Sequence, residues 1–315
     1  MGLPEGWRKR MRLPLICAPM YHVSTPVLVR AARRAGIIAA LPRANAPDFA
    51  SFDRWLAEIM EDQPPASSPP MAVNLSTRLP LEEMTRNLAL CRRRGVELII
   101  SATGDPRTLI QGARDHGMVV FSDAVNLRFA EKSIQAGAQG IIAIGAGGGG
   151  HSGGINHLTL VSAIRSGFDG TIVMAGAVGD GRALRAAEVL GADMAYMGTR
   201  FIATEESGAP DDYKRMLVRS GVDDVLYTAA INGVHANWLK PSLRERGLDP
   251  DRLPVRPDGA RGHAHLPPDT VPWRNLWSAG QGVQQIDAIL PVAGLLDDVE
   301  REYRLACATP PFASR

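Results

Sequence analysis

A glycine-rich stretch ends in a histidine that could move protons. Residues 145–154 read GAGGGGHSGG, and His151 directly follows four consecutive glycines, Gly147, Gly148, Gly149 and Gly150. A loop without side chains can lie against a flat ring or admit a substrate, and histidine is the side chain best suited to transfer protons near neutral pH. We therefore predict a catalytic role for His151; the alternative is a structural or idle histidine beside a flexible loop.

Two further glycine turns have the composition of a phosphate site. The segments AGAVGDG and MGTRFIATEES contain Gly176 and Gly198, which allow close approach of a ligand to the backbone. The amides of Ala177 and Thr199, and the Thr199 hydroxyl, can donate to phosphate oxygens, and a short helix opening at Thr199 would add its positive end. FMN, a nucleotide or a sugar phosphate would fit such a site; simple strand-to-helix turns are the alternative.

The remaining histidines do not form a metal-binding pattern. They are His22, His116, His157, His235, His263 and His265. None has the spacing of a ligand pair such as HExxH, so the sequence predicts no metal. Tyr21 and His22 directly follow the first predicted strand, and we expect them to form part of the wall of the substrate pocket.

The elements that must position these residues form a regular alternation. Eight short apolar or β-branched runs cover residues 13–18, 37–41, 71–74, 97–101, 118–122, 140–144, 171–175 and 194–197. Segments of helical period separate them, and several end in a glycine, where a left-handed C-cap is common. Mostly apolar strands indicate a parallel sheet buried on both faces, and eight units favour an α/β fold of the (β/α)8 TIM barrel type.

A barrel of this kind explains where the motifs lie. Catalytic groups of such barrels gather at the C-terminal ends of the strands, and phosphate is commonly held after strands seven and eight. The glycine stretch and the two turns follow the sixth, seventh and eighth predicted strands. Residues 203–273 are charged, Pro-rich and without a clear strand, which predicts a helical lid or substrate subdomain inserted before the last barrel helix. The barrel would comprise residues 1–202 and 274–315.

Composition excludes several classes of partner. The chain has 315 residues, with 35 Lys and Arg against 33 Asp and Glu, so the net charge of +2 provides no strong field for nucleic acid or an anionic membrane. No apolar run approaches the ~20 residues of a membrane-spanning helix. The basic N-terminal stretch precedes only four residues between Pro14 and Pro19, too few for a secretory signal, so we expect a cytoplasmic protein. The oligomeric state stays open, with a homodimer as one option.

The motifs together resemble a known enzyme family. APM after the first strand, Val73 and Asn74, the glycine stretch ending in His151, AGAVGDGR, ADMAYMGTRFIATEES and SAGQGV occur in this order. This combination, over about residues 13 to 300, resembles the nitronate monooxygenases, formerly called 2-nitropropane dioxygenases. The resemblance implies an FMN-dependent barrel with a small helical second domain, in which His151 acts as the base.

The resemblance also implies an FMN site. The phosphate would lie on Gly176, Ala177, Gly198 and Thr199. The isoalloxazine ring would lie near Ala18, Pro19, Met20, Asn74 and the loop Gly147–Gly150, with Gln281 and Gly282 closing over the cofactor.

Several positions depart from the family pattern, among them Ala146 or Gly147, where the family often has an acidic residue before AGGH. Ala177 stands where a second glycine is common, and Tyr21 and His22 stand where glycines follow APM. Asp123, which we count among the cofactor-binding residues, replaces a basic residue that some members carry near the end of strand five. The phosphate site should survive the change at Ala177, whereas the others bear on which small-molecule substrate is used.

Three functions follow from these observations. The first is FMN-dependent oxidation of alkyl nitronates or nitroalkanes by oxygen to a carbonyl compound and nitrite. The second is an FMN-dependent NAD(P)H:quinone or enoyl reductase on the same barrel; the absence of a separate GxGxxG unit favours the first without deciding between them. The third is a non-catalytic barrel that binds a phosphate ligand.

Overall fold

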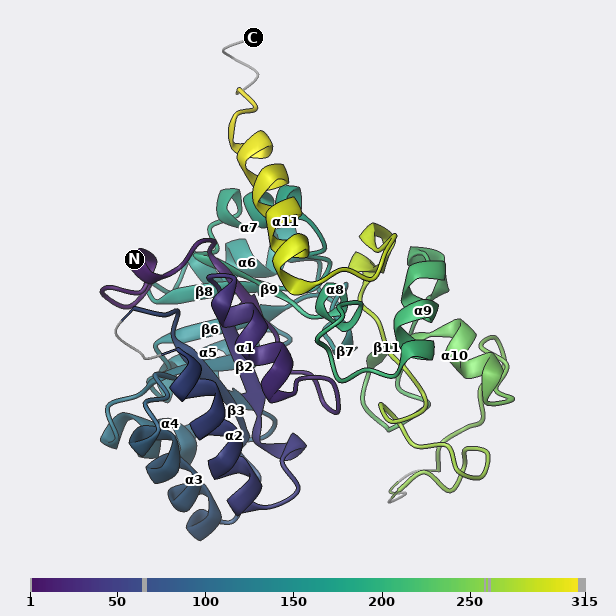
Figure 1. The fold of residues 1–315 in the computed structure, drawn as a ribbon. Coiled ribbons are helices and arrows are strands. Elements are labelled where there is room, and N and C mark those ends of the chain that lie inside the picture. Colours follow the sequence, from purple (N-terminus) through teal and green to yellow (C-terminus); the bar gives the residue numbers. More distant parts are fainter. Residues whose placement is uncertain (1, 64–66, 258, 260–261, 311–315) are drawn as a thin grey trace.

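Eight parallel strands close into a barrel in the computed structural model, which describes residues 2–63, 67–257, 259 and 262–310 (Figure 1). The barrel strands are β1 (Leu15–Cys17), β2 (Ile38–Pro42), β3 (Met71–Ser76), β4 (Leu98–Ala102), β5 (Val119–Ala124), β6 (Gly140–Ile144), β8 (Thr171–Ala175) and β9 (Met194–Met197). β1 pairs with both β2 and β9, which closes the barrel. Each strand lies within two residues of its predicted position, and the (β/α)8 prediction is confirmed.

Helices surround the barrel on its outer face. They are α1 (Pro26–Arg34), α2 (Phe49–Asp62), α3 (Leu81–Arg93), α4 (Arg107–Asp115), α5 (Leu127–Gln135), α6 (His157–Arg165), α7 (Gly181–Val189), the short α8 (Thr199–Ile202) and α11 (Val292–Cys307); the short 3-10 turns among them are η1 (Arg8–Arg10), η2 (Arg43–Asn45) and η4 (Gln281–Gln285). Side-chain N-caps on Thr25, Asp48, Asn126, Asn156 and Asp180 begin five of the helices. α11 packs against α7 and α1, as predicted for the last barrel helix (Figure 1).

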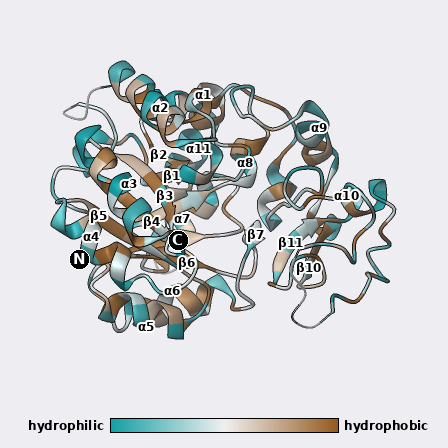
Figure 2. Cartoon of the chain, turned by 90° about the horizontal axis from the view of Figure 1, so that it is seen from below, coloured by the Kyte–Doolittle hydropathy of each residue, from teal (hydrophilic) through white to brown (hydrophobic). Residues whose placement is uncertain are grey.

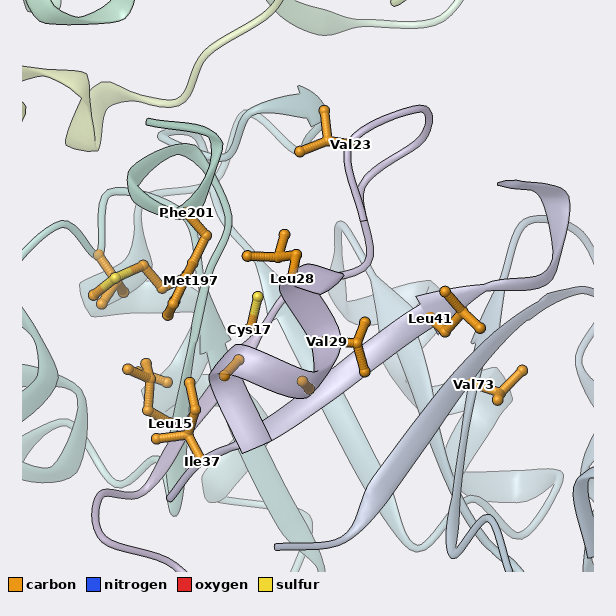
Figure 3. Packing of buried hydrophobic residues seen from close by; sticks show 14 of the residues in the cluster. Leu15, Cys17, Val23, Leu28, Val29, Ile37, Leu41, Val73, Met197 and Phe201 are labelled. Carbon is orange, nitrogen blue, oxygen red and sulfur yellow. The ribbon is translucent and has the colours of Figure 1, made fainter. Parts of the chain in front are cut away.

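Two apolar layers hold the barrel together. The outer layer lies between strands and helices, where Leu28 and Val29 of α1 pack with Cys17 and Leu41 of the sheet (Figure 3). Figure 2 shows the same division, with hydrophobic strands inside and hydrophilic residues on the outer helix surfaces. The inner layer fills the barrel itself with residues such as Phe121, against which the buried Trp7 packs at a ring distance of 6.0 Å. A filled interior leaves the strand ends as the place for a ligand.

Residues 203–273 are not purely helical, and this part of the prediction is wrong. They contain α9 (Asp211–Arg219), η3 (Val222–Asp224), β10 (Val225–Thr228), β11 (Ala236–Leu239) and α10 (Lys240–Glu245). The strand order β10-β11-β7 forms a small antiparallel sheet whose third strand, β7 (Gly150–His151), belongs to the glycine stretch. Because each of these strands has four residues or fewer and one partner lies far away in the sequence, local periodicity could not reveal them.

The insertion has its own small core. Trp238 of β11 is fully buried and packs with Leu243 and Leu266, and Leu276, beyond the predicted boundary at residue 273, joins this cluster. Part of the predicted Pro-rich loop, residues 258 and 260–261, lies outside the described residues. In Figure 1 the insertion lies to one side of the barrel, next to β7.

Candidate active site

The alternation of side chains along each strand forms the floor of a cavity. In a strand every second residue points to the same face. The last inward-pointing residue of each strand therefore lies beyond the filled interior, at the C-terminal end of the barrel. A cavity of about 470 Å³ lies at this end, within the range typical of ligand pockets. One residue from each barrel strand or its end contributes to the floor: Ala18, Pro42, Asn74, Ala102, Asp123, Ile144, Ala175 and Tyr196.

Three residues of this floor are polar, and one lacks a partner. Oδ1 of Asp123 is buried with no hydrogen-bond partner among the described residues, and burial raises the pKa of this carboxyl to about 7. Tyr196 is half-buried, and this desolvation together with the nearby Asp123 raises the pKa of its hydroxyl well above the ordinary value. Asn74 donates from Nδ2 to the carbonyl of Ile100 at 3.3 Å. The floor therefore offers polar groups to a ligand in an otherwise apolar setting.

The glycine loop is fixed by its neighbours at the rim. The carbonyl of Gly147 accepts hydrogen bonds from the amides of Ala177 at 3.1 Å and Gln281 at 2.9 Å. Gly176 has φ +100°, and a Cβ there would lie 2.5 Å from the amide nitrogen of Gly148, so only glycine fits. The glycine loop, the turn after β8 and the SAGQGV segment thus form one interlocked rim.

This arrangement corrects one detail of the predicted phosphate site. The Ala177 amide donates to the glycine loop, so it is not free to donate to a phosphate oxygen. The turn after β8 packs onto the glycine loop, and the Ala177 amide finds its hydrogen-bond acceptor there, at the carbonyl of Gly147. Ala177 has φ +55°, a left-handed conformation that favours glycine.

The turn after β9 is open. A Cβ at Gly198 would meet only ordinary contacts, 3.5 Å to Cβ of Ala18 and 3.6 Å to Sδ of Met20, and its φ of −113° suits any residue. The protein's own packing therefore does not require glycine at this position, which leaves bare backbone facing the cavity. Oγ1 of Thr199 accepts the amide of Gly280 at 2.9 Å and keeps its own proton to donate.

His151 lies at the rim in β7, opposite Ala236 of β11. Nε2 of its ring is 3.0 Å from Nδ2 of Asn232, and the Trp273 ring lies edge-on at a centroid distance of 5.0 Å. Partial burial, and then the charge of Arg78, lower the pKa of His151. The imidazole is therefore neutral at pH 7, the form that can accept a proton.

Asn237 of β11 connects the insertion to the glycine loop. Its buried Nδ2 donates to the carbonyls of Ala146 at 3.1 Å and Gly148 at 2.6 Å, and lies 3.1 Å from Oγ of Ser152. Together with the pairing of β7 and β11, these bonds set the position of the loop that carries His151.

Asn237→Ala is expected to lower the free energy of unfolding by about 1–3 kcal/mol, because two buried carbonyls lose their donor. Chemical denaturation monitored by circular dichroism would measure this loss. Asn232→Ala, which removes a side chain bound at the rim, is the matched control and should change stability by no more than about 0.5 kcal/mol. Equal stability of Asn237→Ala and the unmodified protein would show that the amide does not hold the loop.

Most of the predicted site residues line one cavity. They are Ala18, Pro19, Met20, Tyr21, Asn74, Asp123, Gly147, Gly148, Gly149, Gly150, His151, Gly176, Ala177, Gly198, Thr199 and Gly282. Gln281 and His22 are not among the lining residues. Gln281 binds the glycine loop through its backbone amide. The His22 ring lies tilted against the Tyr21 ring at a centroid distance of 3.8 Å, and the backbone amide of His22 donates to Oδ1 of Asn45 at 3.0 Å.

Sequence reasoning missed several residues of the site. Strand alternation could have located Tyr196, since it lies two residues beyond the buried Met194. No local pattern pointed to Tyr213 and Trp273, which the insertion contributes to the cavity wall. His157 is structural at this rim: its Nε2 bonds the carbonyl of Ala175 at 2.9 Å.

Two negative findings apply to the described residues. Within these ranges no three His, Cys, Asp or Glu side chains are grouped to hold a metal ion. No helix in this part of the chain is both long and apolar enough to span a membrane.

Comparison with known proteins identifies the family of this chain. A family model described as nitronate monooxygenase matches residues 36–302. The chain is 29% identical over 236 residues to (3aS,4S,5R,7aS)-5-hydroxy-7a-methyl-1-oxo-octahydro-1H-indene-4-carboxyl-CoA dehydrogenase of Mycobacterium tuberculosis, covering 74% of this chain and 64% of that protein. The chain spans about two-thirds or less of the length of the curated relatives it matches most strongly.

Solved structures extend the likeness to nearly the whole chain. A nitroalkane oxidase from Streptomyces ansochromogenes is 26% identical with a TM-score of 0.78, covering 95% of this chain and 98% of that one. FabK from Thermotoga maritima, 24% identical with a TM-score of 0.76 and 94% of each chain covered, shares the fold. Because the family match covers most of its length, this chain belongs to the nitronate monooxygenase family.

Proposed function

We propose that this protein binds FMN in the cavity at the end of the barrel and oxidises alkyl nitronates or nitroalkanes with oxygen, giving a carbonyl compound and nitrite. The observation that carries the proposal is the neutral His151 at the rim of a cavity whose loop and turns are built from bare glycine backbone. A base at this place suits a substrate whose α-proton must be removed.

The residues present fit FMN. Gly198 leaves backbone exposed to the cavity although the protein's packing would admit a Cβ there, and the Thr199 hydroxyl has a proton to donate. These two residues would hold the phosphate. The unpartnered Oδ1 of Asp123 on the floor calls for a polar partner on a ligand, which the heteroatoms of the isoalloxazine ring would supply. The glycine loop would leave room for the ring itself.

The side chains prepare the substrate for oxidation. His151 would remove the α-proton of a neutral nitroalkane at Nε2, with the substrate taking the place of the hydrogen bond that Nε2 accepts from Nδ2 of Asn232 in this structure. Trp273 and Tyr213 form an apolar wall that limits the access of water. When bound, FMN supplies the electron acceptor for the resulting nitronate and a route for the electrons to oxygen. We further propose that the insertion, which contributes both wall residues, acts as a lid over the site.

A second candidate is oxidation of an acyl-CoA thioester. The likeness to the CoA dehydrogenase favours it, as do two exposed arginines, Arg78 and Arg274, whose charges lower the pKa of His151 and of His22. Neither arginine forms an ion pair with another described residue, so both are available to an anionic substrate tail. The proposed base would serve this reaction equally, because the α-proton of a thioester is also acidic.

Purified protein is expected to be yellow and to release FMN on denaturation. Under anaerobic conditions ethyl nitronate should bleach the flavin absorbance, whereas NADPH should not, which separates an oxidase from a reductase. Bleaching by an acyl-CoA alone would favour the second candidate. Release of FAD instead of FMN would contradict the proposal. A folded, flavin-free protein that does not bind added FMN would contradict it as well.

A further inference from the structure

The floor of the cavity contains one carboxyl group that the proposed proton transfer does not use. Asp123 is the third of three alternate residues of β5 that point into the barrel, after Val119 and Phe121. On the adjoining strands β4 and β6, the corresponding floor residues are Ala102 and Ile144, both apolar. Asp123 therefore lines the cavity with a carboxyl group whose buried Oδ1 has no partner, and no polar floor residue lies beside it on either neighbouring strand.

No described charge compensates an ionised Asp123. Tyr196 of β9 is close enough to interact electrostatically with Asp123, and burial raises the pKa of its hydroxyl, so it is neutral at pH 7. Cys17 of β1 lies in the outer layer and is also neutral, because burial raises its pKa. His157 is bonded to a backbone carbonyl, and His151 lies at the rim with a lowered pKa. Among the described residues Asp123 forms no ion pair, so ionising this carboxyl places an unpaired charge in a buried setting.

We propose that Asp123 works as a neutral carboxylic acid, whose hydroxyl donates a hydrogen bond to a heteroatom of the isoalloxazine ring lying above the floor. The inference rests on the proposed FMN site. A protonated carboxyl combines one donor with one acceptor, so it can pair with a ring edge that presents a carbonyl or an imine nitrogen next to an N–H. FMN binding is then coupled to the presence of one proton on Asp123.

The coupling predicts how affinity changes with pH. Without the ring, Asp123 loses its proton at a pKa of about 7. Covering the floor removes the last access to water and gives the protonated form a partner, so the bound state raises this pKa further. The affinity for FMN is therefore at its maximum below pH 7. It declines as the pH rises above 7, and the loss approaches tenfold for each further pH unit.

The test is a titration of flavin-free protein with FMN, followed by flavin fluorescence, at pH 6 and pH 8. For the unmodified protein we expect the dissociation constant to rise about tenfold between these pH values. Asp123→Asn keeps a hydrogen-bond donor that cannot ionise, and its dissociation constant should change by less than about twofold. Asp105→Asn, which removes an exposed carboxylate just after β4, is the control and should follow the unmodified protein.

Riboflavin serves as a second probe because it lacks the phosphate, whose own ionisation would otherwise add to the pH dependence. The same difference between the unmodified protein and Asp123→Asn should appear with either probe. Parallel pH profiles of the two proteins would overturn the inference while leaving FMN binding intact. No binding of FMN by the unmodified protein at either pH would overturn the proposed function and the inference with it.

A further readout covers the case in which Asp123→Asn folds but binds no flavin. Infrared difference spectra of the unmodified protein at pH 6 should then show a protonated-carboxyl band that shifts when FMN is added, and flavin-free Asp123→Asn should lack this band. A band that FMN does not move, or no band at all, would overturn the inference.

Discussion

His151→Ala is expected to slow the oxidation of a neutral nitroalkane by about 10²- to 10⁴-fold, the usual contribution of general acid-base catalysis. The same variant should oxidise a pre-formed nitronate at a rate much closer to that of the unmodified protein, because the nitronate has already lost its α-proton. Steady-state rates with nitroethane and with ethyl nitronate, compared at one pH, would measure the two effects. The contrast between substrates separates a base from a residue that binds the anion.

Two controls make this comparison decisive. FMN content must be measured in the variant, because His151 lies in β7 next to the glycine loop and a collapsed loop would imitate loss of the base. His116→Ala, at the C-cap of α4, is the matched control and should leave both rates unchanged. Equal losses with both substrates and full FMN content would reject the base assignment. Full activity with both would make His151 a structural residue.

Gly198→Glu is expected to abolish FMN binding while the barrel stays folded. The backbone at this position accepts a side chain without strain, since a Cβ meets nothing closer than 3.5 Å. A carboxylate held about 4 Å from the phosphate would add roughly 4 kcal/mol of repulsion per unit charge at an effective dielectric constant near 20, or about a thousandfold in affinity. Flavin absorbance of the purified variant and a direct FMN titration would measure the loss.

Gly198→Ala provides the matched comparison, because it adds the Cβ without the charge. It should keep much more of the FMN affinity than the glutamate variant, and circular dichroism should show both proteins folded. If Gly198→Glu retained full FMN occupancy, the phosphate would have to lie elsewhere. If alanine and glutamate were equally damaging, the cause would be steric, and the argument from charge would be wrong.

The barrel could be predicted because the sequence signals for its strands and helices lie within short contiguous segments. Each strand is a short apolar run between helices whose C-terminal glycines mark the boundaries, and both features can be read without knowing any partner. The positions of His151 and Gly198 followed from the barrel, since ligand sites lie at the C-terminal ends of the strands. The cavity accordingly contains both residues.

The parts that escaped prediction depend on contacts between distant segments. Pairing of β7 with β11 joins residues more than eighty positions apart, and neither strand is long enough to show a period. The Ala177 amide was expected to be free, but its bond to Gly147 exists only because two turns meet at the rim. Likewise, Asn232 and Asn237 acquire their roles from the fold of the insertion and not from any motif.

The strand β7 has a consequence for any attempt to change substrate range by exchanging residues 203–273 with those of another protein. Because Gly150 and His151 pair with Asn237 and Ala236, the transplanted segment would have to supply a new edge for this two-residue strand. A donor segment chosen only for its pocket-facing side chains would leave the histidine without its backbone partner. Successful grafts should therefore be selected first for that register and only then for the shape of the wall they provide.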